Sequence, residues 1–415
     1  MKNKIKVIFL LLTLIIGIFT FIMEVPITYS ESINGTDWIQ FRHDLNNTAC
    51  TNTTLTTNNG HYWKRSFSPE ESILSSPVIY NKKIYFGSPD HNIYCLNIST
   101  GQTIWNFMTS WEVHSSGVIY DNKLYIGSAY DFYCLDADTG SIIWQSENTG
   151  RLPAIHDGKV YFGDMAHHFY CLNATNGTEI WKTDVGDQTI SCPAIFDNQI
   201  FFSSGINFYS LNQTNGDILL NFTTGDFVYT SPSIFINRVY FGSNDGNVYC
   251  LNISNGSIFW QFDTGYEIES SPAISSGNLY IGSGDGTLYC LNPINGSLIW
   301  KNKIGFDIYA SPAISNDMLY IPSDNRIFCL NINTGEVIWS WDIGTNRLLS
   351  SPAIANGRII IGDDENEIYC FPLLNTGSQI SLDWILLFII IMISIGGTVA
   401  AVIIIIYYLR RKKAN

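Results

Sequence analysis

The sequence is poor in charge and poorest in basic residues. Only 14% of its 415 residues are Asp, Glu, Lys or Arg, and 36 acids stand against 22 bases. Seven of the bases and one of the acids lie in the terminal segments 1–24 and 410–415, so the body between them has a formal charge of −20. Such a body repels phosphate backbones, which excludes nucleic acid as a partner.

Sequence motifs for several kinds of chemistry are also missing. The chain contains no Cys-X-X-Cys pair, no His-Glu-X-X-His, no Gly-X-Ser-X-Gly and no phosphate-binding glycine loop. No two of its nine cysteines are adjacent. We therefore predict no catalytic residue and no metal site.

Seven of the cysteines occupy one position of a repeat, and Ser210 takes that position in the remaining unit. Equivalent positions in neighbouring units are expected to lie beyond the ~7 Å limit for disulfide-bonded Cα atoms, so we expect small buried thiols rather than disulfides. Cys50 lies outside the repeat, and a bridge from it to Cys370 is the alternative for that residue.

Long apolar runs are confined to the two ends of the chain. Residues 1–30 begin with three lysines followed by an apolar run, the layout of a signal peptide or an uncleaved signal anchor. Residues 384–409 carry no charge and as a helix would rise about 39 Å, enough to span a bilayer. The basic tail 410–415 then stays in the cytoplasm. With a linker at 374–383, this predicts a single-pass protein of the cell membrane whose body lies outside the cell.

Helical periodicity is absent from the body, and a repeat of about 40 residues takes its place. A complete unit has four anchors: Ser271-Pro272, Tyr280-Ile281-Gly282, Tyr289-Cys290-Leu291-Asn292, and a glycine followed four residues later by Trp300. Short aromatic-rich stretches lie between Asn-Gly, Asp-Gly and Thr-Gly turns, which is typical of four antiparallel strands. The repeat therefore predicts the blades of a β-propeller.

The number of anchors predicts eight blades. The first anchor recurs at residues 76, 116, 152, 192, 231, 271, 311 and 351. The last unit lacks a Trp strand, whereas Trp63 precedes the first unit, so we expect the strand at Trp63 to complete the last blade and close the ring. The predicted fold is all-β: an eight-bladed propeller over 60–373, preceded by an N-terminal extension at 31–59 and followed by one transmembrane helix.

Asn-X-Ser/Thr sequons recur within the repeat and support an extracellular body. Chance occurrence in an Asn-rich chain is the alternative explanation. The glycosylation candidates lie in one exposed turn of the unit. They are Asn97, Asn176, Asn212, Asn255 and Asn295.

The repeat frame resembles the pyrroloquinoline-quinone-like (PQQ-like) repeat of quinoprotein alcohol dehydrogenases and their non-enzymatic relatives. Residues 38–44 and Thr48 are similar to the segment that opens many such propellers, and the resemblance covers about residues 38–373. It implies one of two functions. The dehydrogenases bind PQQ and calcium over the ring centre, cover the quinone with an adjacent cysteine pair and carry long insertions, whereas other members are assembly scaffolds or surface proteins. This chain has neither the pair nor the insertions, so we expect the non-enzymatic, membrane-anchored branch without a cofactor. A PQQ-dependent dehydrogenase with calcium is the alternative.

The segments that enter each blade vary sharply between constant anchors. Such segments gather on one face of a propeller, so we interpret them as a candidate ligand face for a protein, peptide or glycan partner. Unconstrained loops would vary in the same way, and the sequence leaves the oligomeric state open. The candidate residues are Glu112, His114, Arg151, Phe227, Tyr229, Glu267, Glu269, Asp307, Tyr309 and Arg347.

Overall fold

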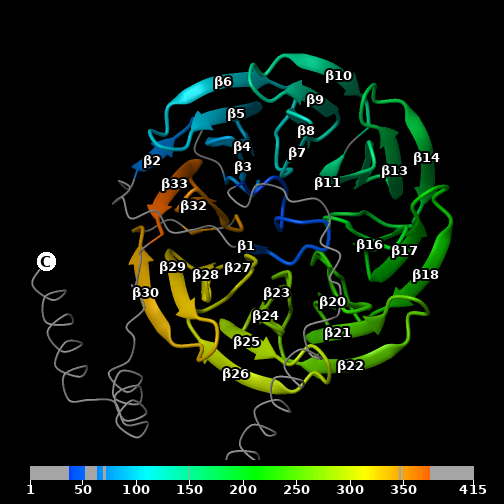
Figure 1. Cartoon of the computed structure of the whole chain (residues 1–415), viewed down its shortest axis with the longest axis vertical. Coiled ribbons are helices and arrows are strands. Elements are labelled where there is room, and N and C mark those ends of the chain that lie inside the picture. The colour runs from blue at the N-terminus through cyan, green and yellow to red at the C-terminus, as the bar shows by residue number, and fades with distance from the viewer. Residues whose placement is uncertain are drawn as a thin grey trace, which may run out of the picture.

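Eight antiparallel sheets surround a common centre in the computed structural model, which confirms the eight-bladed propeller (Figure 1). Each blade has four strands in chain order from the centre outward, apart from the closing blade and one extra inner strand. The structure describes residues 37–51, 63–68, 72–148, 150–344, 347–348 and 350–373.

The first four blades follow one another along the chain. Blade 1 contains β3 (Val78–Tyr80), β4 (Lys83–Ser88), β5 (Asn92–Asn97) and β6 (Thr103–Met108). Blade 2 contains β7 (Val118–Tyr120), β8 (Lys123–Gly127), β9 (Phe132–Asp136) and β10 (Ile142–Ser146). Blade 3 contains β11 (Arg151–His156), β12 (Lys159–Gly163), β13 (His168–Asn173) and β14 (Glu179–Asp184). Blade 4 contains β15 (Ala194–Phe196), β16 (Gln199–Ser204), β17 (Asn207–Asn212) and β18 (Ile218–Thr223).

The last four blades repeat this order and take in the two N-terminal strands. Blade 5 contains β19 (Ser233–Phe235), β20 (Arg238–Gly242), β21 (Asn247–Asn252) and β22 (Ile258–Asp263). Blade 6 contains β23 (Ala273–Ser275), β24 (Asn278–Gly282), β25 (Thr287–Leu291) and β26 (Leu298–Lys303). Blade 7 contains β1 (Cys50–Thr51), β27 (Ala313–Ser315), β28 (Met318–Ser323), β29 (Arg326–Asn331) and β30 (Val337–Asp342). Blade 8 contains β31 (Ala353–Ala355), β32 (Arg358–Gly362), β33 (Glu367–Pro372) and β2 (Trp63–Ser66).

The antiparallel order divides the turns between two faces. The upper face carries the turn between the second and third strands of a blade and the connector from its fourth strand to the next blade. The lower face carries the turns between the first and second strands and between the third and fourth. Lower-face pairs such as Asp121 and Asn122 have positive φ angles of 49° and 56°, as a type I′ hairpin requires.

Strand β2 closes the ring as the sequence predicts. Trp63 pairs with Cys370 and Ser66 with Glu367, so the N-terminal strand forms the outer edge of blade 8. The Trp63 indole N–H donates to the carbonyl of Ile98 in blade 1 at 3.1 Å. The first and last blades are thereby joined without an exposed sheet edge between them.

The recurring tryptophans lie between neighbouring blades. The Trp144 indole N–H donates to the carbonyl of Ala174 at 3.0 Å, and its ring packs on Gly177. A Cβ at Gly177 would lie 2.6 Å from that ring, and its φ of +72° already disfavours other residues. A glycine in this turn therefore provides both a left-handed conformation and room for the side chain of the preceding blade, which is a tryptophan in every blade but one among those with such a glycine.

A chain of hydrogen bonds through the first anchors follows most of the upper mouth of the channel, from Cys192 round to Ser116. The Ser271 N–H donates to the hydroxyl of Ser311 at 3.0 Å, and Ser311 donates likewise to Ser351. Ser351 in turn donates to Ser76 of blade 1 at 3.0 Å, which closes this chain across the junction of the ring. The serine of the first anchor thus links successive blades, while the proline precedes the inner strand.

Residues 37–51, which we call the plug, run through the channel (Figure 1, blue). The plug meets blades 1, 2, 4, 5, 6 and 7 in that order, because its carbonyls accept hydrogen bonds from their innermost strands. Each donor is the middle residue of a first strand. The donors are Ile79, Ile119, Ile195, Ile234, Ile274 and Ile314.

Polar side chains fix the plug to the anchors above it. The Arg42 guanidinium donates to the carbonyls of Pro312, at 3.1 Å, and Pro272. The Asn47 amide donates to the carbonyls of Cys192 and Pro232 at 3.2 and 3.0 Å. Arg42 thereby connects the plug to the adjacent blades 6 and 7, and Asn47 connects it to the adjacent blades 4 and 5.

All nine cysteines are free, and all except the half-buried Cys50 are buried. The alternative bridge between Cys50 and Cys370 is therefore wrong. Cys50 lies in the channel, where its thiol contacts the hydroxyl of Ser275 at 3.3 Å, whereas Cys370 lies in the third strand of blade 8.

The two terminal segments, at 1–30 and 374–415, lie outside the described residues. Within the part of the chain that the structure describes, no helix is long and apolar enough to cross a membrane.

Candidate binding site on the upper face

Most upper-face connectors share a local design in which a buried aliphatic residue separates two outward side chains. Ile268 is fully buried between Glu267 and Glu269, and Ile308 between Asp307 and Tyr309. The buried residue packs on the glycine that ends the second strand: a Cβ on Gly242 would lie 2.3 Å from Ile268. The anchors that end at Gly242 and Gly282 thus hold the connectors after blades 5 and 6 in a fixed position.

Most of the candidate residues gather over blades 5 to 8. Glu267, Glu269, Asp307 and Arg347 all act electrostatically on the Tyr309 hydroxyl, whose pKa is raised first by burial and then by these acids, while Arg347 opposes the rise. Tyr229 has its pKa raised by burial and by Glu269. We call Glu267, Glu269 and Asp307 the acidic sector.

The members of the acidic sector are not equivalent. Both oxygens of Asp307 contact the Arg347 guanidinium, at 2.9 and 2.8 Å. Glu267 and Glu269 have no ion pair within the described residues. Burial raises the pKa of Glu269 despite an opposing hydrogen bond from Asn244, and the neighbouring Glu267 adds to the rise. Two carboxylates that have no cation among the described residues therefore lie close together on the upper face.

The remaining candidates form contacts of their own. Glu112 and His114 form their own pair at 3.0 Å on the connector to blade 2. Phe227 stacks on Tyr229 with ring centroids 5.7 Å apart. Arg151 begins strand β11, and burial lowers its pKa. The sequence grouped all of these residues with the acidic sector. Phe227 adjoins the sector through Tyr229, whereas the described residues show no bond between the sector and Glu112, His114 or Arg151.

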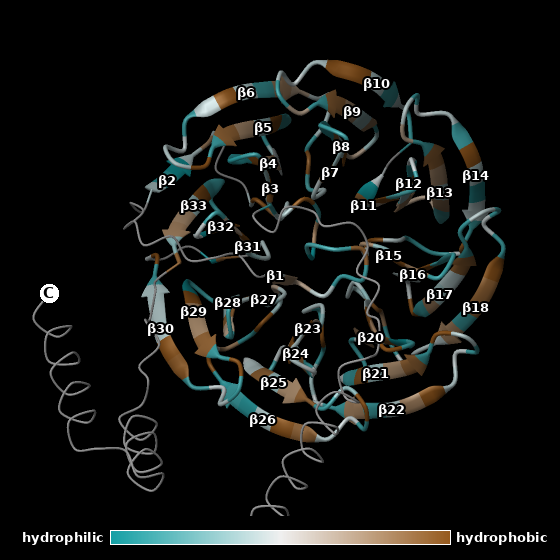
Figure 2. Cartoon of the chain, in the orientation of Figure 1, coloured by the Kyte–Doolittle hydropathy of each residue, from teal (hydrophilic) through white to brown (hydrophobic). Residues whose placement is uncertain are grey.

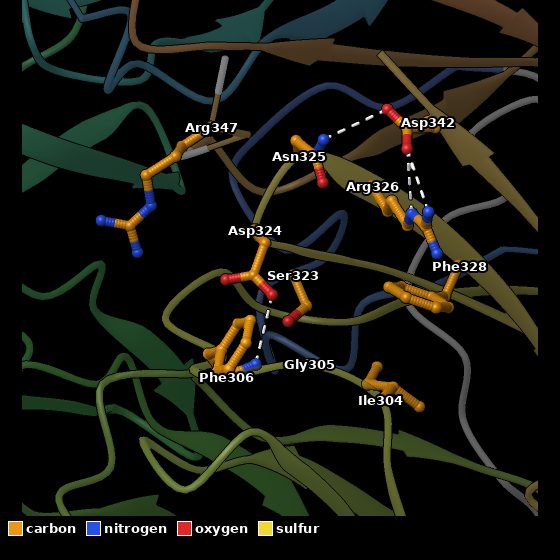
Figure 3. A pocket seen from close by; sticks show the side chains of 10 residues that line it. All are labelled: Ile304, Gly305, Phe306, Ser323, Asp324, Asn325, Arg326, Phe328, Asp342 and Arg347. Carbon is orange, nitrogen blue, oxygen red and sulfur yellow. Dashed lines mark hydrogen bonds and ion pairs between the residues drawn. The ribbon is translucent and has the colours of Figure 1, made fainter. Parts of the chain in front are cut away.

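A pocket of about 540 Å³ that we did not predict from the sequence lies at the rim between blades 6 and 7 (Figure 3). Arg326 forms two hydrogen bonds with Asp342, at 3.2 and 3.0 Å, on one side of the pocket. Asp324 accepts a hydrogen bond from the backbone N–H of Phe306 at 3.1 Å on the other side. Arg347 also lines the pocket, which therefore adjoins the acidic sector.

A break in the repeat accompanies this pocket. In blades 5 and 6 the third-strand tyrosine donates its hydroxyl to the aspartate of the upper turn, as Tyr249 does to Asp245 at 2.6 Å and Tyr289 to Asp285 at 3.0 Å. Blade 7 has Phe328 at the tyrosine position, so this bond cannot form. The replacement of Tyr by Phe was the signal in the sequence that could have found the pocket.

The mouth of the channel does not fit a site for PQQ and calcium. A ligand with several carboxylates would meet Glu267 and Glu269, and the nearby Arg347 is already paired with Asp307. The plug occupies the channel below (Figure 1). Among the described residues, no group of three or more His, Cys, Asp and Glu side chains is arranged to hold a metal ion.

Comparisons with known proteins place the chain in a family. A family model described as outer membrane protein assembly factor BamB matches residues 51–147, 131–267 and 244–380, well over half of the chain. No curated protein sequence matches.

Solved structures share the fold at low sequence identity. BamB from Moraxella catarrhalis is 15% identical, with a TM-score of 0.63 over 75% of this chain and 100% of its own. The quinohemoprotein alcohol dehydrogenase ADHIIG from Pseudomonas putida HK5 is 11% identical, with a TM-score of 0.72 over 82% of this chain and 80% of its own. The computationally designed protein Ika8 is 15% identical, with a TM-score of 0.65 over 74% and 98%. The chain belongs to the PQQ-like repeat β-propeller family whose model carries the description of BamB.

Proposed function

We propose that the protein is a membrane-anchored binding or scaffolding module that presents its upper face outside the cell to a cationic protein or peptide. The observation that carries the proposal is the pair of carboxylates, Glu267 and Glu269, which have no ion pair within the described residues and sit on rigidly held connectors. A lysine or arginine of a partner would find two acids there without displacing an existing cation.

The pocket of blade 7 supports a polypeptide partner. Phe306 is 84% exposed at its rim, and Arg326 and Asp342 line one side. An exposed aromatic residue beside a pocket and an acidic patch suits a chain that carries both apolar and basic side chains.

Membrane anchoring rests on the sequence of the two ends. The apolar segment 384–409 and the basic tail after it support an anchor with the propeller outside. The match to a family described as an assembly factor is compatible with a scaffold that performs no reaction.

The test is the binding of a fluorescent oligo-lysine peptide to the full chain in detergent. We expect the Glu267→Gln/Glu269→Gln double variant to bind about tenfold more weakly and to show a weaker dependence on salt. The matched control is Glu179→Gln/Glu336→Gln, which removes the same charge from two exposed glutamates at outer lower-face turns. Equal affinity of the wild type and the first variant would overturn the proposal.

A quinoprotein dehydrogenase is the alternative, favoured by the structural likeness to the Pseudomonas putida enzyme over most of both chains. Reduction of a dye by an alcohol or sugar, dependent on added PQQ and calcium, would establish it in place of the scaffold. We expect no such turnover.

A further inference from the structure

We propose that N-linked glycans occupy Asn176, Asn255 and Asn295, at the tips of lower-face turns, and cover the apolar residues that follow on the outer strands. All three are sequons in the turn between the third and fourth strands of a blade. The glycans would lie on the face opposite the acidic sector, and the proposal does not depend on what that sector binds.

The turn orients each of these asparagines for modification. The side-chain oxygen of Asn176 accepts the N–H of Thr178 at 3.1 Å, and those of Asn255 and Asn295 accept from Ser257 and Ser297 at 3.0 Å. All three residues are exposed, and none of their amide nitrogens donates a hydrogen bond within the described residues. The atom that a glycan requires is thus free while the oxygen is held.

The other two candidates occupy a different position. Asn97 and Asn212 end the third strand, are half-buried and pair in the ladder with Lys83 and Gln199. The Asn97 oxygen accepts two backbone N–H groups, from Ser99 and Thr100, at 2.9 and 3.1 Å. The five candidates, alike in sequence, separate into tip and base positions, and only the tips are accessible enough to carry a glycan.

A band of exposed apolar residues lies beside the tips. The outer strand begins with a bulge, visible as a register shift between Cys250 and Leu251 in blade 5, and it exposes two consecutive side chains. In that blade they are Ile258 and Phe259, which are 47% and 46% exposed. Brown segments on the outer strands, such as β10, β18 and β22, follow this band around the ring (Figure 2).

The positions of the sequons indicate that glycans cover this apolar band. Asn255 and Asn295 are each followed, after a glycine and a serine, by the exposed pair Ile258-Phe259 or Leu298-Ile299. A bulky, hydrophilic glycan at the tip is in reach of the pair behind it and reduces the exposed apolar area. Blade 2 has an exposed pair without a tip sequon, Ile142 and Ile143, and provides an internal comparison.

The modification is a transfer from a lipid-linked oligosaccharide. The amide nitrogen of the asparagine forms a bond to the anomeric carbon of the first sugar. The bond from that carbon to the lipid phosphate breaks, the lipid phosphate leaves with the electron pair, and the amide proton passes to a base of the transferase. No oxidant or reductant is needed.

Site mapping by mass spectrometry of the full chain, produced in a eukaryotic secretory host, tests the proposal. We expect glycans at Asn176, Asn255 and Asn295 and unmodified Asn97 and Asn212. Unmodified asparagines at all three tips would overturn the proposal, and so would equal occupancy of tip and base.

An added sequon sharpens the experiment. Asn215 is the tip of blade 4 but is followed by Gly216 and Asp217, so it is no sequon. Asp217→Thr should add one glycan, whereas Asp217→Ala should add none. Enzymatic removal of the glycans should raise the fluorescence of a dye that binds apolar surface. Occupied tips with unchanged dye fluorescence would contradict the covering role.

Discussion

The plug and the ring of blades are built on opposite principles. In the ring each contact recurs: Trp105, Trp144, Trp181, Trp260 and Trp300 all donate to a carbonyl of the following blade. In the plug, fifteen residues carry the backbone hydrogen bonds to six blades, and Arg42 and Asn47 each bond two carbonyls of the blades. The ring therefore distributes its stability over many equivalent sites, whereas the plug concentrates long-range contacts in one short segment. A single change should cost more in the plug than in a blade.

Removing the N-terminal segment should have the largest effect. A chain that starts at Ser72 lacks both the plug and β2, so blade 8 exposes an edge and six blades lose their inner hydrogen bonds. We expect the cooperative unfolding transition to disappear in circular dichroism or calorimetry, whereas a chain starting at residue 31 keeps it. A Ser72 chain that melts as sharply as the longer one would contradict the closure.

Asn47→Ala should have the next largest effect. The Asn47 side chain is fully buried and bonds the carbonyls of Cys192 and Pro232, and its φ of 53° disfavours alanine. We expect a loss of about 3 kcal/mol in the free energy of unfolding, because two buried carbonyls lose their donor and the backbone is strained. Denaturant titration measures this loss. If Asn47→Ala cost less than the ring variant Ser271→Ala, the contrast between plug and ring would be wrong.

Ser271→Ala makes the equivalent change in the ring. It removes one hydrogen bond of the repeated series, from the Ser231 N–H at 2.9 Å. We expect a loss of about 1 kcal/mol by the same titration. Ser231→Ala and Ser311→Ala should lower the free energy of unfolding by similar amounts, since the same bond recurs at each anchor. Widely different losses would show that the blades do not contribute equally to stability.

The smallest effect should appear at acid pH. Burial raises the pKa of Asp44 in the plug, but His43 and the hydrogen bonds from Thr48 outweigh it and lower the pKa below its ordinary 3.8. The stability that the Asp44 carboxylate contributes is therefore fully present above pH 3.8 and is lost as the pH falls through the folded-state value. The stability difference between wild type and Asp44→Asn should shrink as the pH falls below about 3.8, measured by denaturant midpoints. A constant difference would exclude this linkage.

The repeat made most of the ring predictable. A period, a recurring Trp and a last unit that lacks one were enough to predict eight blades and closure by Trp63, because each blade uses the same local contacts. The free cysteines followed for the same reason, since equivalent positions in neighbouring blades are separated by a whole sheet.

The plug and the upper face were less predictable. The sequence identified residues 31–59 only as an extension, because the plug contacts residues up to 270 positions away through backbone carbonyls that carry no sequence pattern. The constant isoleucine of each first strand can be read from the sequence, but nothing in the sequence indicates that its backbone N–H donates to a carbonyl of the plug. The candidate face was predicted as a ring of variable residues, whereas the pairing of Arg347 with Asp307 and the pocket at Phe328 depend on neighbouring blades.

By itself the sequence determined the unit, the number of units and the face on which they vary, because strand alternation, turn residues and the Trp-Gly contact act within a blade or between adjacent ones. Only the tertiary structure decided what fills the centre and, among the described residues, which carboxylates lack a cation. These properties arise when the ring closes and brings connectors of different blades together around one axis. No local sequence pattern predicts which of their side chains then come into contact.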